Sequence, residues 1–94
     1  MVMKRTENVR ELRAKRFRRG LGARIVQSRQ RRGWSQATLA ERLDLQRERL
    51  AKWEAGRHAP PAEVLLALSE ELETTVDELL SGRKPGFPEA PNKD

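Results

Sequence analysis

The chain has 94 residues, of which 36% are charged and 4% are aromatic, and it contains no cysteine. This length suits one small domain with an aliphatic core, and the lack of cysteine excludes disulfides and thiolate metal sites. The formal net charge of +6 favours a polyanionic partner. No apolar run approaches the ~18 residues of a membrane span and no signal peptide is evident, so we expect a cytoplasmic protein without membrane contact.

The positive charge is concentrated in the first third of the chain. Residues 1–34 hold twelve Lys and Arg against two Glu, and residues 35–58 hold five against four acidic residues. Residues 59–94 hold three against eight, so the net charge runs from +10 through +1 to −5 along the chain. This asymmetry predicts a basic surface for a polyanion and an acidic part kept away from it.

Residues 1–20 are predicted to form a basic N-terminal arm. Thr6 is a suitable N-cap for a helix over roughly 7–19. The apolar residues of this segment do not line one face, so the helix has little to bury. Gly20 and Gly22 are expected to interrupt the helical pattern. We interpret the arm as a disordered tail that adds non-specific attraction to phosphate, with specific reading of the minor groove as the alternative.

The domain itself is predicted to cover residues 21–81, and its first helix to run over 21–32 and end at Gly33. Leu21 and Ile25 fall on the inward face of this helix. The outward arginines are interpreted as solvated charges: Arg24, Arg31 and Arg32.

Two short helices joined by a tight turn follow. Ser35 stands at the N-cap of the second helix, and the third helix spans roughly 46–55 and ends at Gly56. Asp44 falls in the turn, where a left-handed residue is wanted, and Asp is among the few residues that tolerate a positive φ. The inward faces are apolar: Leu39, Ala40, Leu43, Leu45, Leu50 and Trp53.

Two further helices complete the domain. Pro60–Pro61 is predicted to open the fourth helix, and the capping-box pattern Thr75–Glu78 to start the fifth. Their apolar residues recur at helical spacing: Val64, Leu65, Leu68, Leu72, Val76, Leu79 and Leu80. Residues 82–94 contain three prolines and no periodicity, which indicates a disordered Pro/Gly-rich tail. The predicted fold is all-α, a compact five-helix bundle with a helix-turn-helix on helices 2 and 3.

The third helix carries long hydrogen-bonding side chains opposite its apolar back: Gln46, Arg47, Glu48, Arg49 and Lys52. A helix that is anchored on one side and polar on the other suits the major groove of DNA. That groove is wide enough for an α-helix and carries a distinct donor and acceptor pattern for each base pair.

Catalysis is not indicated. His58 is the single histidine, and without cysteine it cannot anchor a usual zinc site. The sequence has no Ser/His/Asp set, paired catalytic carboxylates or glycine-rich phosphate loop. We therefore expect no enzymatic activity, no metal, no cofactor and no small-molecule ligand.

A series of short motifs between Leu21 and Leu80 resembles the helix-turn-helix domain of the phage lambda repressor and Cro family, often called XRE-like. The resemblance covers about 60 of the 94 residues in one register. The matching motifs are Gly33-Trp-Ser-Gln36, Leu39-Ala40, Leu50, Trp53-Glu54-Ala-Gly56-Arg57, Pro60-Pro61 and Val76-Asp-Glu-Leu-Leu80.

The resemblance implies roles for single residues. Gln36 would donate to a phosphate and buttress the third helix, while Gln46 and Arg57 would make further phosphate contacts. Arg47 and Glu48 stand where the family places its leading base readers. Lys52 lies further along the same face. Arg49 is a further candidate for DNA contact, because it is one of the outward side chains of the third helix.

The same resemblance implies that Arg29 and Glu54 form a partly buried ion pair between the first and third helices. Several residues depart from the family pattern: Ser28 replaces an apolar residue, Asp44 and Glu73 replace glycines, and Gln46 is a poor N-cap. Glu48 on the reading face would repel phosphate unless it accepts from a cytosine amino group or pairs with a nearby cation.

The sequence therefore predicts a sequence-specific DNA-binding transcriptional regulator, repressor-like, acting as a dimer on a pseudo-palindromic operator. Val76, Leu79 and Leu80 of the fifth helix are the candidate dimer interface. Two alternatives remain open. In the first, the chain is an antitoxin that masks a toxin and regulates its own gene by binding DNA. In the second, it is a protein-binding adaptor that has lost DNA readout.

Overall fold

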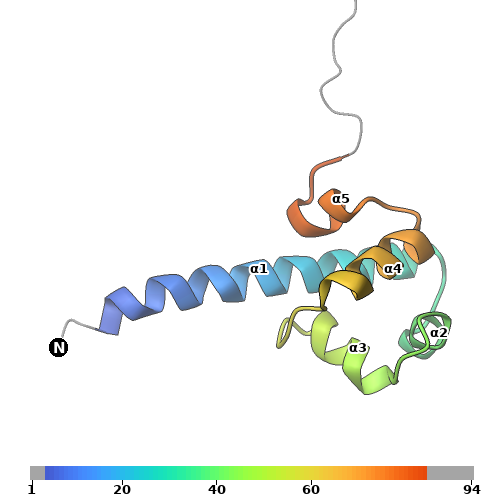
Figure 1. Cartoon of the computed structure of the whole chain (residues 1–94), viewed down its shortest axis with the longest axis horizontal. Coiled ribbons are helices and arrows are strands. Elements are labelled where there is room, and N and C mark those ends of the chain that lie inside the picture. Colours follow the sequence, from blue (N-terminus) through green and yellow to red (C-terminus); the bar gives the residue numbers. More distant parts are fainter. Residues whose placement is uncertain (1–3, 85–94) are drawn as a thin grey trace, which may run out of the picture.

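The computed structural model describes residues 4–84, with side chains from residue 8 onward, and this part of the chain forms five α-helices and no β-strand. The bundle gathers around the C-terminal half of the first helix (Figure 1). The helices are α1 (Lys4–Arg31), α2 (Gln36–Arg42), α3 (Arg47–Glu54), α4 (Ala62–Leu72) and α5 (Val76–Ser81). The predicted all-α fold with its helix-turn-helix on α2 and α3 is confirmed. Most of the predicted disordered tail, residues 85–94, lies outside the described residues.

The predicted interruption at Gly20 and Gly22 is wrong, because α1 continues through both glycines. Gly22 does not interrupt the helix but allows α1 and α3 to pack closely. A Cβ on Gly22 would lie 2.5 Å from the carbonyl oxygen of Trp53 and 2.6 Å from that of Glu54. Only glycine therefore allows α1 to lie directly against the end of α3.

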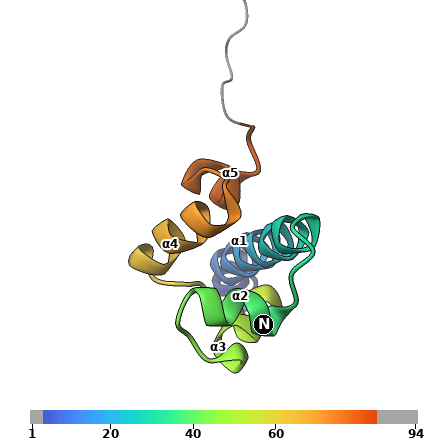
Figure 2. The same cartoon turned by 90° about the vertical axis from the view of Figure 1, so that its right-hand side faces the viewer.

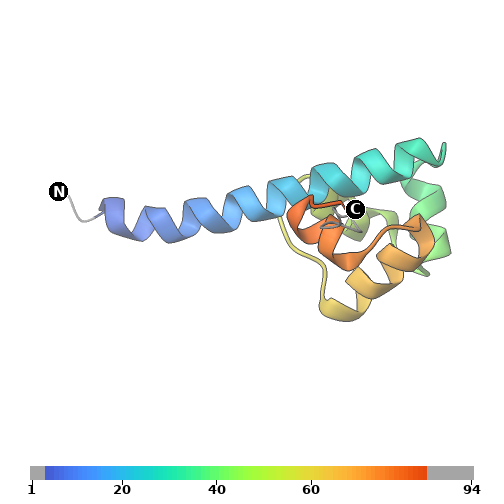
Figure 3. The same cartoon turned by 90° about the horizontal axis from the view of Figure 1, so that it is seen from above.

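The N-terminal part of α1, residues 4–19, projects beyond the bundle (Figures 1 and 3). We call it the α1 extension. Side chains 8–17 are all exposed, including the apolar Val9, Leu12 and Phe17. Residues 8–17 bury no apolar face against the rest of the domain, as their irregular apolar pattern predicted.

The core lies where the C-terminal half of α1 meets the other four helices. Leu21 and Ile25 of α1 are at most 1% exposed, as predicted for its inward face. The remaining core residues come from every other helix: Leu39, Ala40, Leu50, Trp53, Leu68, Leu72 and Leu79. Each short helix contributes only one to three buried residues, so the helices depend on one another for stability.

Local signals place the helix ends. Ser35 and Thr75 each accept a hydrogen bond from the backbone N–H three residues later, at 3.0 and 2.9 Å, and so cap α2 and α5. Pro61 is the N-cap of α4, which begins one residue later than the proline pair suggested. Asp44 and Glu73 have φ values of 59° and 54°, so both occupy the left-handed conformation that glycine adopts most easily.

The Trp34 ring, in the loop between α1 and α2, lies against two arginines. The guanidinium groups of Arg32 and Arg42 lie 4.6 and 4.4 Å from its centre. Arg42 also pairs with Glu71 at 2.7 Å, and Arg32 with Glu73 at 3.3 Å. Figure 2 shows this end of the bundle facing the viewer. The two cations thereby connect the helix-turn-helix to an acidic part of the chain, since residues 59–82 hold six acidic and no basic residues.

Arg24 was expected to be a solvated charge, and this expectation is wrong. Its Nε donates to the carbonyl oxygen of Leu79 at 2.7 Å, and its Nη2 donates to that of Leu80 at 2.8 Å. The last carbonyls of a helix lack partners within the helix. Arg24 therefore supplies both hydrogen bonds and holds the end of α5 on α1.

Candidate nucleic-acid interface

Helix α3 is anchored through its back and exposes its polar face. Leu50 and Trp53 are 0% and 3% exposed, which fixes the helix in the bundle. The side chain of Gln46 makes no capping hydrogen bond, as expected for a poor N-cap. The predicted DNA-contacting residues of this helix and its N-cap are all exposed: Gln46, Arg47, Glu48, Arg49 and Lys52.

An ion pair lies behind this face. Arg29 donates from Nε and Nη2 to the two carboxylate oxygens of Glu54, at 2.8 and 2.9 Å, so the structure brings together the two residues that the resemblance paired. The two side chains are only 11% and 4% exposed. Arg29 also donates to the carbonyl oxygen of Trp34 at 2.8 Å. The hydrogen bond to Glu54 raises the pKa of Arg29, which therefore stays charged at every working pH.

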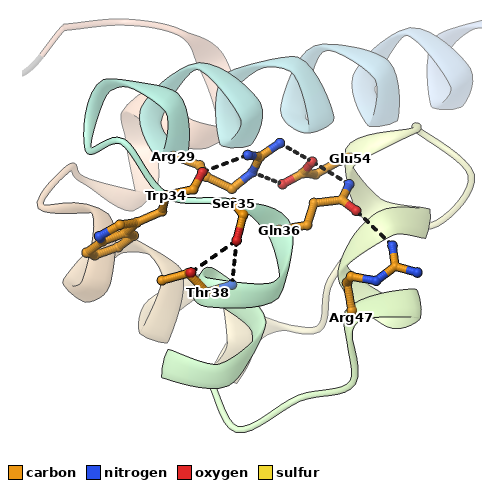
Figure 4. A network of polar contacts seen from close by, with 7 residues as sticks. All are labelled: Arg29, Trp34, Ser35, Gln36, Thr38, Arg47 and Glu54. Atoms are coloured by element: carbon orange, nitrogen blue, oxygen red, sulfur yellow. Dashed lines mark hydrogen bonds and ion pairs between the residues drawn. The ribbon is translucent and has the colours of Figure 1, made fainter.

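A chain of hydrogen bonds runs from the ion pair to the protein surface (Figure 4). Gln36 donates from Nε2 to Oε1 of Glu54 at 2.8 Å, and its Oε1 accepts from Nη1 of Arg47 at 3.2 Å. A carboxylate only accepts, so Glu54 forces the amide group of Gln36 inward and its carbonyl outward. The exposed Arg47 is therefore positioned through Gln36 by a buried pair on α1 and α3.

The other predicted contact residues differ in how they are held. Arg49 lies with its guanidinium 5.3 Å from the centre of the Trp53 ring, which holds it on the flank of α3. Glu48 and Lys52 are exposed on the helix, and Arg57 is exposed in the turn that follows it. The structure thus joins Gln36 and Arg47 directly and leaves Glu48, Lys52 and Arg57 exposed on α3 and in the turn after it.

One contact next to this surface was not anticipated. Arg18 donates from Nε to the carbonyl oxygen of Gly56 at 3.2 Å, and this links the base of the α1 extension to the turn that carries Arg57. The two residues are 38 positions apart. No local pattern in the sequence signals a contact of this kind.

The candidate dimer residues on α5 are unequally exposed. Leu79 is 1% exposed and belongs to the core, so it is not accessible to a partner. Val76 and Leu80 are half-buried. Of the three candidate residues, only Val76 and Leu80 therefore keep accessible apolar surface.

Neither a metal-binding cluster nor a helix able to cross a membrane occurs in the described part of the chain. No group of three or more His, Cys, Asp or Glu in residues 4–84 is arranged to hold a metal ion. Among these residues there is also no helix with the length and apolar character needed to cross a membrane.

Three features together define the class of protein. They are a capped supporting helix, a second helix with an exposed polar face, and a buried ion pair behind that face. Residues 25–79 match the family described as "Helix-turn-helix". The chain belongs to this family, in its lambda repressor and Cro (XRE-like) branch, whose domains bind double-stranded DNA.

A curated relative is the "HTH-type transcriptional activator BcrR" of Enterococcus faecalis. The two proteins are 42% identical over 50 residues. The matched stretch is 53% of this chain and 24% of the relative, so the chain spans only a small part of that protein's length.

Proposed function

We propose that the protein is a sequence-specific transcriptional regulator that inserts α3 into the major groove of DNA. The observation that carries this proposal is the Gln36–Arg47 hydrogen bond, because it presents Arg47 from the exposed face of α3 in a fixed direction. An arginine held in this way is suited to bidentate donation to the O6 and N7 atoms of guanine.

Neighbouring side chains have complementary roles in this proposal. Gln36 has two amide hydrogens, and Glu54 uses one of them. The second would bind a backbone phosphate, and Arg57 would bind another from the turn after α3. Glu48 would accept from a cytosine amino group, and Lys52 would add a contact further along the groove.

The proposal includes a homodimer on a two-fold operator, because a single reading helix covers only a few base pairs. Half-sites would then be centred about one helical turn, ~34 Å, apart. Val76 and Leu80 on α5 are the proposed contact between subunits. The protein would act by binding and not by catalysis.

The test is selection of bound genomic fragments by the purified protein at physiological salt. We expect a motif with two-fold symmetry, and the position of the motif relative to promoters would separate repression from activation. Recovery of fragments without a shared motif would overturn the proposal and favour a protein-binding role.

A further inference from the structure

The α1 extension is attached rigidly to the reading helix. Its base is fixed by Gly22, which packs on the end of α3, and by the hydrogen bond from Arg18 to Gly56. Gly56 has a φ of 79°, and a Cβ there would lie 3.1 Å from Cα of Arg19. These contacts determine the direction of α1 relative to α3. Wherever α3 lies on a partner, the extension is held at a set position beside it.

The charges of the α1 extension repel one another along the helix. Cations stand three or four residues apart at several positions, and such neighbours destabilise a helix. They form the pairs Arg10–Arg13, Arg13–Arg16, Arg16–Arg19, Lys15–Arg18 and Lys15–Arg19. Only Glu11 and Lys15 form an opposite pair among the described side chains of this segment. A polyanion that neutralises the cations would therefore stabilise the helix as well as bind it.

The helical repeat determines which cations of the α1 extension lie on the side of α1 that faces α3. Gly22 marks the side of α1 that packs on α3, and Lys15 stands seven residues, about two turns, before it. Arg19 adjoins the same side and contacts Gly56. Arg10 and Arg13 are rotated from Gly22 by roughly 120° and 180° around the helix axis.

We propose that Lys15 and Arg19 bind the sugar-phosphate backbone of DNA immediately outside the half-site that α3 reads. This inference rests on the proposed function, since α3 in the groove is what brings the extension to the flanking phosphates. It assigns the extension a docked position, in contrast to a diffuse attraction spread over all of its cations.

The experiment compares two charge-matched double variants of the full chain, Lys15→Gln/Arg19→Gln and Arg10→Gln/Arg13→Gln. Affinity is measured against salt concentration on a 30-base-pair DNA duplex with the selected half-site at its centre and on a 12-base-pair duplex that contains little beyond the same half-site. Each phosphate contact contributes about 0.9 to the slope of log affinity against log salt. Circular dichroism and thermal melting verify that each variant folds.

We expect Lys15→Gln/Arg19→Gln to lower the slope on the long duplex by about 2 and to leave it nearly unchanged on the short one. Arg10→Gln/Arg13→Gln should change neither slope appreciably. In wild type, amide hydrogen exchange of residues 8–19 should slow when the long duplex binds. Equal effects of the two variants, or no effect of either, would overturn the proposal. Weaker self-association of Lys15→Gln/Arg19→Gln without a change in slope would instead place the extension on a second copy of the chain.

The proposed regulator and the docked α1 extension can be disproved independently of each other. If wild type shows no sequence preference, the proposed regulator is wrong, and unequal salt slopes of the two variants on an arbitrary 30-base-pair duplex would still show that Lys15 and Arg19 contact phosphate. If the preference is present and the slopes of the two variants agree, only the docked extension is wrong.

Discussion

Gln36 and Arg47 lie on different helices of the helix-turn-helix, and Oε1 of Gln36 accepts a hydrogen bond from Nη1 of Arg47 at 3.2 Å. The amide of Gln36 is itself oriented by Glu54. The direction of Arg47 is therefore set in the free protein, and in the proposed complex with DNA less side-chain freedom would be lost on binding.

Replacing Arg47 with alanine should weaken binding to the selected operator by ~1–3 kcal/mol and relax the preference at one base position. The measurement is a fluorescence anisotropy titration with the operator and its single-base variants. Arg83→Ala is the control, because it removes the same charge from an exposed site after α5. Similar losses for the two variants, with the base preference intact, would show that Arg47 acts only through its charge.

Glu54→Ala should lower the free energy of unfolding by ~3–5 kcal/mol, because Arg29 would remain buried without its carboxylate. Urea unfolding measures the change. Glu71→Ala serves as the control. It breaks the more exposed pair with Arg42 and should cost less than about 1 kcal/mol. Comparable costs for the two variants would contradict a special role for the buried pair.

Gly22→Ala should destabilise the domain by ~1–3 kcal/mol, since the added methyl group would overlap the carbonyl oxygens of Trp53 and Glu54 and separate α1 from α3. Gly20→Ala should change stability less, because the nearest atom to its Cβ is the guanidinium of Arg24 at 3.2 Å. Thermal melting of both variants checks this. A larger loss at Gly20 would disprove the assigned contact.

Glu73→Gly should stabilise the protein. The left-handed conformation of Glu73 costs an L-residue ~1–2 kcal/mol, and glycine loses only ~0.5–1 kcal/mol more conformational entropy on folding. The variant also loses the exposed ion pair with Arg32, which contributes less than about 1 kcal/mol, so the melting temperature should rise by only a few degrees. Glu70→Gly, inside α4, should instead lower stability by about 1 kcal/mol. Changes of the same sign at the two positions would contradict this reasoning.

Arg24→Ala should loosen α5 selectively, because the carbonyl groups of Leu79 and Leu80 would lose their charged donor. A hydrogen bond to a charged group contributes ~1.5–3 kcal/mol, which corresponds to at least about tenfold faster opening. Amide hydrogen exchange of α5 measures this, and α2 provides the internal reference. Uniform acceleration throughout the domain would mean that Arg24 supports the whole core.

Elements with local signals were predictable from the sequence. Ser35 and Thr75 marked the starts of their helices, because an N-cap bonds to a backbone N–H only three residues away. The left-handed turn at Asp44 was inferred because few residue types adopt this conformation. Apolar spacing identified the inward faces of all five helices. The exposed polar face of α3 followed from the same spacing.

Features that depend on distant contacts were not predictable in this way. Gly22 was interpreted as a break because glycine weakens an isolated helix, whereas its role is set by Trp53, 31 positions later. Arg24 reaches a partner 55 residues away. The pairing of Arg29 with Glu54 came from family resemblance and not from spacing. Such contacts exist only once the helices have packed.

The distribution of charge gives the folded molecule a permanent electric dipole. Eleven Lys and Arg stand on α1 against two Glu, while the segment of α4 and α5 carries only acidic charges. The negative field of DNA exerts a torque on such a dipole and turns the cationic side toward the duplex. At physiological ionic strength this torque acts over only about 8 Å, so the molecule rotates in the last step of its approach. Fewer encounters then end in the wrong orientation.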